Sequence, residues 1–168
     1  MSFTPELERT KALTPEQAAK ILSTAANWSF SNLQINKILF LSQMTYMYQT
    51  GGKPLISGLF QAWDYGPVLP SIYHALKCFG SNPVRNIFRT VSTGSATHEQ
   101  RHILEQAAKR FRNTSPGYLV RVTHMPDGAW AKNYDQTSRY VSIPNSDIFE
   151  EAQLRYGPTK RARPARPV

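Results

Sequence analysis

The sequence predicts a mainly α fold with a small β element (α+β), built as a compact bundle of about five to six helices in a single domain. Apolar residues recur at helical spacing in six stretches, each preceded by a capping residue or a proline. The links between successive stretches are short, which favours a bundle. The length of 168 residues suits one domain, and a hydrophobic content of 40% is too high for a disordered chain.

The first two helices are predicted from their ends. The run 14–17, Thr-Pro-Glu-Gln, is a helix-start pattern, so a helix is expected over about 15–26. A second helix is expected to begin after Ser31 or Asn32 and to end at Gly51. Because this helix is apolar on nearly every side, we expect it at the centre of the core.

The middle of the chain changes to proline, glycine and aromatic residues over 53–70. A short strand is expected over 59–63, followed by a tight turn at 64–67. A third helix is then predicted from Pro70, with Gly80 as its stop.

The second half predicts three more helices. One is expected over 97–111, capped at its first residue, and the next begins at 115–116 and ends before 125–128. A brief β-like run at 140–143 comes before a last amphipathic helix over about 144–154.

Three segments divide the chain: a flexible N-terminus (1–13), the helical domain (14–157) and a basic disordered tail (158–168). The tail alternates Arg, Ala and Pro without apolar periodicity. Its last nine residues hold four cations and no acid, so removing four from the net charge of +9 leaves +5 on residues 1–159. Two interpretations of the tail stay open, a contact with nucleic acid or an acidic partner and a merely solubilising terminus.

The single cysteine, Cys78, excludes an intrachain disulfide and the zinc sites that need two or four cysteines from one chain. We expect it to be a small core residue, not a nucleophile. The N-terminus lacks a leader pattern, and no apolar run approaches the ~20 residues that a bilayer needs. The expected location is the cytoplasm, with no membrane contact.

One pattern match suggests metal chemistry, because His98-Glu99-Gln100-Arg101-His102 satisfies H-E-x-x-H. On a helix the two imidazoles share a face and could bind Zn²⁺ while Glu99 activates a water. However, Thr97 as the cap places His98 in the first turn, and only a distant residue such as His124 could supply a third ligand. No nucleophile elbow, Walker loop or dinucleotide fingerprint is found. We therefore expect no enzyme, no cofactor and no metal site.

Two clusters are not explained by a plain core. One is Trp63-Asp64-Tyr65-Gly66-Pro67-Val68, and the other is the run 123–130, which ends in Trp130. Both could be turns at the edge of the core, with Trp63, Tyr65 and Trp130 packed against the second helix. Aromatic turns are also common recognition surfaces.

At these clusters the sequence resembles the Panacea domain, also called the SocA-like antitoxin domain, over residues 33–131 and more loosely to about 150. Three departures are Asn36, which interrupts the first motif, Val122 before Thr-His and Ala129 before Trp130. The matching pieces, in order, are Leu33-Gln34-Ile35-Asn36-Lys37-Ile38-Leu39-Phe40, Gly52-Lys53-Pro54-Leu55, Ala62 to Val68, Ile72-Tyr73-His74-Ala75-Leu76-Lys77, Gly80, Thr123-His124 and Ala129-Trp130.

The resemblance implies an antitoxin that neutralises a toxin encoded beside it, by direct contact or by delivering the toxin to a cytoplasmic protease. The family also occurs in prophage-borne genes. The residues assigned to partner binding or to the family motif are Trp63, Asp64, Tyr65, Gly66, Pro67, Val68, Tyr73, Lys77, His124 and Trp130.

The alternative is a nucleic-acid-binding regulator that uses the basic surface and the tail, although no helix-turn-helix of recognisable length and polarity is found. Its candidate residues outside the tail are Lys77, Arg85, Arg89, Arg110, Arg112 and Arg121.

Overall fold

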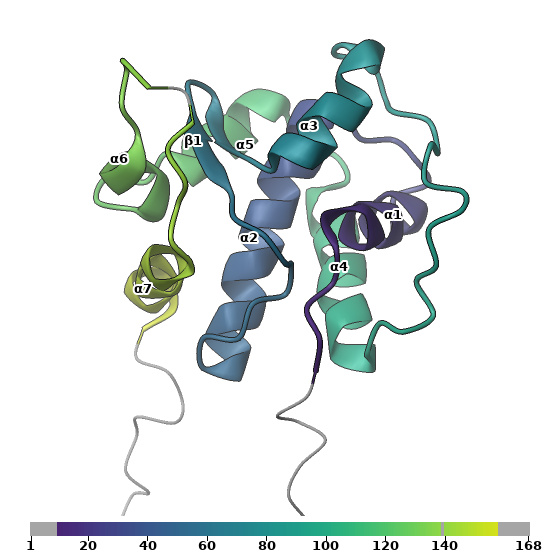
Figure 1. The fold of residues 1–168 in the computed structure, drawn as a ribbon, viewed down its shortest axis with the longest axis horizontal. Helices are drawn as coiled ribbons and strands as arrows, with labels where there is room; N and C mark the ends of the chain where they lie inside the picture. The colour runs from purple at the N-terminus through teal and green to yellow at the C-terminus, as the bar shows by residue number, and fades with distance from the viewer. Residues whose placement is uncertain (1–9, 139, 158–168) are drawn as a thin grey trace, which may run out of the picture.

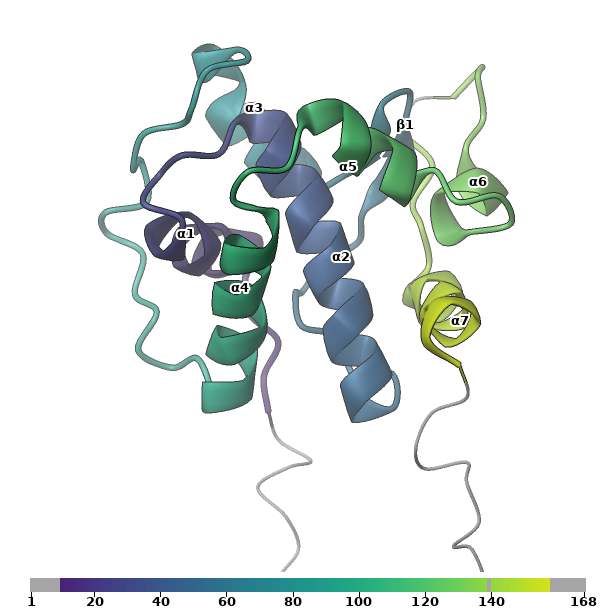
Figure 2. The same cartoon turned by 180° about the vertical axis from the view of Figure 1, so that it is seen from behind.

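Helix α2 (Asn32–Thr50) is the centre of the molecule, and other elements surround it (Figure 1). The structure is a computed structural model that describes residues 10–138 and 140–157. Helices α1 and α4 lie to one side of α2, and α7 lies to the other, as the view from behind also shows (Figure 2). The remaining elements are α1 (Pro15–Ala25), β1 (Gln61–Trp63), β2 (Gly66–Val68), α3 (Pro70–Leu76), the 3₁₀ helix η2 (Lys77–Phe79), α4 (His98–Phe111), α5 (Pro116–Thr123), α6 (Ala129–Asn133) and α7 (Asn145–Tyr156).

The predicted fold class, mainly α with a small β element in one domain, is confirmed. Three helices begin as their sequence patterns predict, because each cap hydroxyl accepts the backbone N–H three residues on and a glutamine returns the bond. The three pairs are Thr14 with Gln17, Ser31 with Gln34, and Thr97 with Gln100. Helix α2 ends at Gly51, whose φ of 73° suits a glycine.

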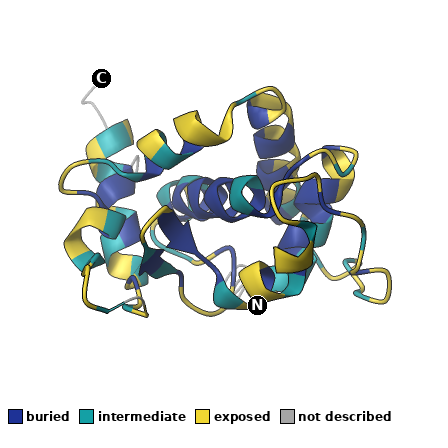
Figure 3. Cartoon of the chain, turned by 90° about the horizontal axis from the view of Figure 1, so that it is seen from above, coloured by how far each residue is buried: buried dark blue, intermediate teal, exposed yellow. Residues whose placement is uncertain are grey.

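Every residue from Ile35 to Met44 in α2 is buried, and Figure 3 shows this helix as a dark rod enclosed by the others. Its few polar side chains connect it to its neighbours. The Gln43 carbonyl oxygen accepts from the backbone N–H groups of Leu55 (2.8 Å) and Ile56 (2.9 Å), and its amide nitrogen donates to Asn145. This side chain therefore ties α2 both to the loop before the hairpin and to the start of α7.

Strands β1 and β2 form an antiparallel hairpin in which Trp63 pairs with Gly66, so Asp64 and Tyr65 are its two-residue turn. The predicted β-like run lies beside β1, because Ala62 N–H donates to Val141 and Ile143 N–H donates to Phe60. The sequence predicted the first strand and the turn but missed β2. It missed β2 because Gly-Pro-Val is too short to show an alternating pattern.

Three other expectations are corrected. Leu13, placed in the flexible N-terminus, is buried and exchanges backbone bonds with the loop at 55–57. Cys78, expected in the core, is exposed because the chain leaves α3 there as a 3₁₀ turn. Helix α6 was not predicted, because five residues show no periodicity. Residues 1–9 of the predicted flexible terminus and the tail at 158–168 lie outside the described residues.

Within the described ranges, no helix is both long and apolar enough to span a bilayer.

Candidate functional site

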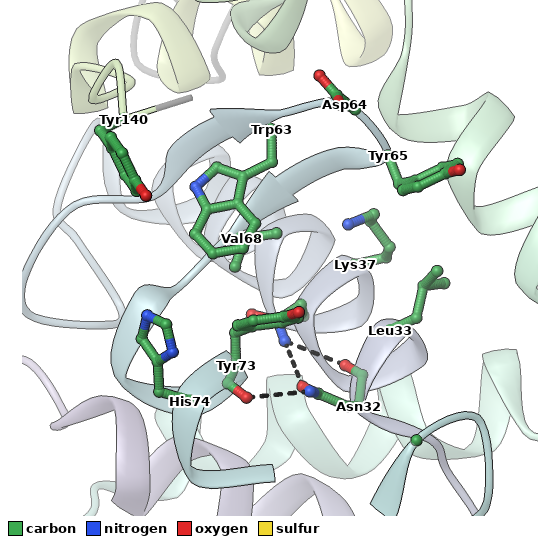
Figure 4. Close-up of a pocket in the computed structure, with 12 residues that line it drawn as sticks. Asn32, Leu33, Lys37, Trp63, Asp64, Tyr65, Val68, Tyr73, His74 and Tyr140 are labelled. Carbon is green, nitrogen blue, oxygen red and sulfur yellow. Dashed lines mark hydrogen bonds between the residues drawn. The ribbon is translucent and has the colours of Figure 1, made fainter. Parts of the chain in front are cut away.

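A pocket of about 450 Å³ lies where the hairpin faces the first turns of α2 and the helix α3 (Figure 4). Five of the ten residues predicted from the sequence meet here. The lining residues are Asn32, Leu33, Asn36, Lys37, Trp63, Asp64, Tyr65, Val68, Tyr73, His74, Gly80 and Tyr140.

Aromatic rings form one wall of this hairpin pocket. Trp63 is central, with its ring 4.8 Å from that of Tyr73, 6.3 Å from that of His74 and 6.4 Å from that of Tyr140. Tyr65 and Tyr140 are each 71% exposed. Such edge-on ring contacts hold the wall in shape, while the exposed rings leave a large apolar surface open to a partner.

Lys37 lies at the floor of the pocket and is only 1% exposed. Its Nζ donates a hydrogen bond to the carbonyl of Pro67 at 2.9 Å, across 30 positions of the sequence. Because burial removes the ammonium from water, it lowers the pKa of Lys37 from 10.5 to about 7. A lysine in this position is poised between its charged and neutral forms near neutral pH.

Gly66 is required by the approach of this lysine. A Cβ at Gly66 would lie 2.8 Å from Cε of Lys37 and 3.1 Å from Oγ1 of Thr123, and its φ of +111° disfavours any other residue. The Gly-Pro pair of the motif therefore has an internal structural role. Gly66 leaves room for the Lys37 side chain, and the Pro67 carbonyl accepts its hydrogen bond.

Two asparagines of α2 fix the edge of the pocket. Asn36 accepts the backbone N–H of Leu69 at 2.9 Å and donates to the Asn32 side chain at 2.9 Å, and Asn32 donates to the Tyr73 carbonyl at 3.1 Å. Asn36, the departure from the first family motif, thus joins α2 to the end of the hairpin and the start of α3.

The turn at Asp64 and Tyr65 is braced from the opposite side. The Trp130 indole N–H donates to the Trp63 carbonyl at 2.7 Å, and the Tyr134 hydroxyl donates to the Asp64 carboxylate at 2.7 Å. The His124 ring packs on Trp130 at 3.8 Å and lies against the Asp64 carbonyl. His124 and Trp130 are therefore supports of the hairpin and do not line the pocket.

A buried carboxylate holds the start of α6 and so positions Trp130. Glu151 of α7 accepts the N–H of Ala129 at 2.9 Å and pairs with Arg155 at 3.1 Å. Burial raises the pKa of Glu151 although Arg155 opposes that shift. A Cβ at Gly128 would lie 2.0 Å from Oε1 of Glu151, so only glycine fits this passage.

The structure divides the ten predicted site residues. Five line the pocket, two lie over Lys37 and two support the hairpin, while Lys77 is exposed on η2 and does not line the pocket. The alternative of a plain core-edge turn is wrong for Tyr65, which is largely exposed. Whether these residues bind a partner stays a prediction.

The sequence analysis missed the pocket residues Asn32, Lys37, His74 and Tyr140 as candidates. For Lys37 a signal existed, because a lysine inside a helix that is apolar on every side must itself be buried. Tyr140 had none, since only tertiary packing brings it beside Trp63.

The zinc pattern of α4 does not form a cluster. His98 and His102 are exposed, with stacked rings 6.0 Å apart. Residues 10–138 and 140–157 contain no group of three or more His, Cys, Asp or Glu side chains that could hold a metal ion.

The basic residues proposed for nucleic acid are spread over η2, the loop 80–96, α4 with its C-cap Arg112, and α5. Two of them pack on neighbouring rings, Arg110 on Phe111 and Arg121 on Tyr118. Their role in binding nucleic acid stays a prediction.

The fold and the site define a small, mainly helical domain that presents a braced aromatic hairpin. A family model, described as Antitoxin SocA-like, Panacea domain, matches residues 35–131, more than half of the sequence. The chain belongs to this family, which confirms the resemblance predicted from its motifs. The matched region includes Lys37, the hairpin and Trp130, whereas Tyr140 lies beyond it.

Antitoxin SocA of Caulobacter vibrioides (strain NA1000 / CB15N) is 28% identical to this protein over 120 residues. The alignment covers 64% of this chain and 62% of that relative, so the chain matches less than two thirds of the relative's length. No solved structure matches the chain significantly.

Proposed function

We propose that this protein is an antitoxin that neutralises a cognate toxin by direct contact, and that the hairpin pocket and its aromatic rim form the contact surface. Membership of the antitoxin family supports the role. The observation that carries the placement is the exposure of Tyr65, on the turn of the hairpin, and of Tyr140, beside Trp63, while Trp130 holds the hairpin backbone from the opposite side.

Rigid aromatic surfaces are efficient in protein interfaces. Tyrosine and tryptophan supply a large contact area, and a surface that is already ordered loses little entropy on binding. Here Trp130 and Tyr134 fix the turn, while the Trp63 ring is held between Tyr73 and Tyr140. The pocket is thus formed before a partner arrives.

Co-expression tests the role. The open reading frame beside this gene is induced alone and together with this protein, and growth is measured. We expect arrest when the neighbour is expressed alone and growth when both are present. A neighbour that is harmless alone, or arrest in both cases, would contradict the proposal.

The same cells separate two modes of action. If the protein blocks the toxin by contact, the amount of toxin stays constant while growth recovers. If it delivers the toxin to a protease, the toxin's half-life shortens and its amount falls. We propose direct blocking, so a toxin that disappears in rescued cells would contradict this mode and support delivery.

The contact surface is tested by matched substitutions of exposed tyrosines. Tyr65→Ser and Tyr140→Ser remove rings at the rim, whereas Tyr118→Ser removes a ring that is 47% exposed on α5. We expect toxin affinity to fall about tenfold or more for the two rim variants and to stay unchanged for the third. Equal effects at all three positions would refute the placement.

A further inference from the structure

We propose that the floor of the hairpin pocket is a subsite for a carboxylate, and that this carboxylate belongs to an acidic side chain of the protein partner. Lys37 is the cation that receives it. The inference deepens the proposed function and rests on it, because it takes the partner to dock at the aromatic rim.

Among residues 10–138 and 140–157, Lys37 has no counter-charge. The described residues form two ion pairs, Lys132 with Glu150 and Arg155 with Glu151, and neither includes Lys37. An ammonium has three N–H donors, and the one acceptor that the described part of the chain gives Lys37 is the Pro67 carbonyl. A buried ammonium without an acidic partner is a costly arrangement that an incoming carboxylate would relieve.

The carboxylate of the pocket itself, that of Asp64, is directed away from Lys37. Asp64 lines the pocket, but its carboxylate accepts the hydroxyl of Tyr134 from the braced side of the hairpin. In Figure 4 the Asp64 side chain points away from Lys37, whose Nζ lies on the side of Trp63 and Val68. The position opposite the ammonium is therefore left to a ligand.

The Lys37 side chain is held in place by the hairpin. Gly66 passes so close to Cε that a single methyl group would collide with it, and the Pro67 carbonyl fixes Nζ. A cation fixed before binding pays little entropy when its partner arrives. Burial also lowers the pKa of Lys37 to about 7, so binding of an anion would be coupled to uptake of a proton.

The aromatic walls of the pocket indicate which kind of residue lies next to the acidic residue of the partner. Trp63, Tyr73 and Tyr140 surround the floor with rings, and a volume of about 450 Å³ exceeds what one carboxylate fills. An acidic residue next to an aromatic or aliphatic one fits both features. The net charge of +5 on residues 1–159 further favours an acidic partner.

Three dipeptide probes test the subsite on the isolated protein. They are N-acetyl-glutamyl-phenylalaninamide, its glutaminyl isostere, and N-acetyl-glutaminyl-phenylalanine with a free terminal carboxylate. Binding is followed by NMR on the labelled indole N–H of Trp63. We expect the glutamyl peptide to bind about tenfold or more tightly than its isostere, because a charge-assisted hydrogen bond is gained.

The other outcomes count against the proposal. Equal binding of the glutamyl and glutaminyl peptides, or no binding of either, would overturn the subsite. Preference for the free terminus over the glutamyl side chain would overturn the assignment to a side chain. These comparisons use the unaltered protein, so they do not depend on the folding of any variant.

A substitution then ties the preference to Lys37. In Lys37→Met the glutamyl preference is expected to vanish, while Lys109→Met, which removes an exposed charge of α4, keeps it. A preference that survives in folded Lys37→Met would contradict the role of this lysine. Failure here is distinct from failure of the proposed function, because a protein that rescues growth without preferring the glutamyl peptide is an antitoxin that lacks this subsite.

Discussion

The two sides of the hairpin at 61–68 differ although they come from one short motif. On the braced side, Trp130 holds the Trp63 backbone and Tyr134 holds the Asp64 carboxylate. On the aromatic side, Tyr65 extends into the open and Trp63 stands among other rings. One family motif therefore contains both residues that support a surface from behind and residues that are exposed on that surface.

The contacts that hold the hairpin in place also explain which residues of the motif cannot be replaced. Gly66 and Trp130 each make a contact that no similar residue could make, because it depends on a missing Cβ or on an indole N–H, whereas Pro67 contributes a backbone carbonyl that any residue carries. Tyr65 on the aromatic side has no such requirement, since its side chain makes no hydrogen bond to the hairpin among the described residues, whereas the Trp63 indole N–H donates to the Gln61 side chain at 2.9 Å.

The largest expected effect lies at Gly66. Gly66→Ala places a methyl group 2.8 Å from Cε of Lys37 at a φ of +111°, so we expect a loss of about 2–4 kcal/mol in the free energy of unfolding. Gly58→Ala is the control, because Gly58 has a φ of +82° with nothing within 4 Å. It isolates the backbone strain, about 1–2 kcal/mol. Equal losses in urea unfolding would show that Lys37 does not require the glycine.

The next effect is a pH dependence caused by Lys37. Its pKa is lowered from 10.5 to about 7, so between these values the unfolded chain binds a proton that the folded protein does not. The free energy of unfolding therefore rises with pH, by about 1.4 kcal/mol per unit, and is flat below the folded pKa. Between about pH 7.5 and 9.5 we expect the free energy of unfolding of the unaltered protein to rise by about 2–3 kcal/mol more than that of Lys37→Met.

The comparison with Lys37→Met isolates this residue. The other titratable groups around it are present in both proteins, so the difference between the two curves reports Lys37 alone; these groups are Asp64, Tyr65, Tyr73, His74, His124 and Tyr140. Parallel curves over the alkaline range would mean that Lys37 keeps an ordinary pKa in the folded protein.

The smallest expected effect is a difference in the free energy of unfolding between substitutions on the two sides of the hairpin. Trp130→Phe keeps a ring but removes the bond to the Trp63 carbonyl, so about 1 kcal/mol should be lost. Tyr65→Ser removes a ring that is 71% exposed, and we expect a change below about 0.5 kcal/mol. Chemical unfolding measures both, and a larger loss for Tyr65→Ser would erase the distinction between the sides.

Local sequence signals predicted most of the helices, because caps and apolar spacing act within a few residues. Thr14, Ser31 and Thr97 start helices as expected, and Gly51 ends the central one. Short elements were less visible, since β2 and α6 span three and five residues. The exposure of Cys78 was missed because α3 becomes a 3₁₀ turn before reaching it.

The site was predicted in part. The aromatic turn at Trp63 and Tyr65 was found because its composition is unusual for a core. The separate roles of the site residues were not predicted. His124 and Trp130 look like recognition residues in the sequence, but in the structure they lie behind the hairpin and support it.

The sequence by itself determined that this protein is a mainly α domain with a central apolar helix, an aromatic turn and the motifs of an antitoxin family. Only the tertiary structure decided that Lys37 lies beneath Gly66 and Pro67 and that Tyr140 stands beside Trp63. The two kinds of feature differ in how far apart along the chain the interacting residues are. Helix caps and turns depend on neighbouring residues, whereas the burial of a lysine and the meeting of two rings depend on how distant segments pack, which no local pattern encodes.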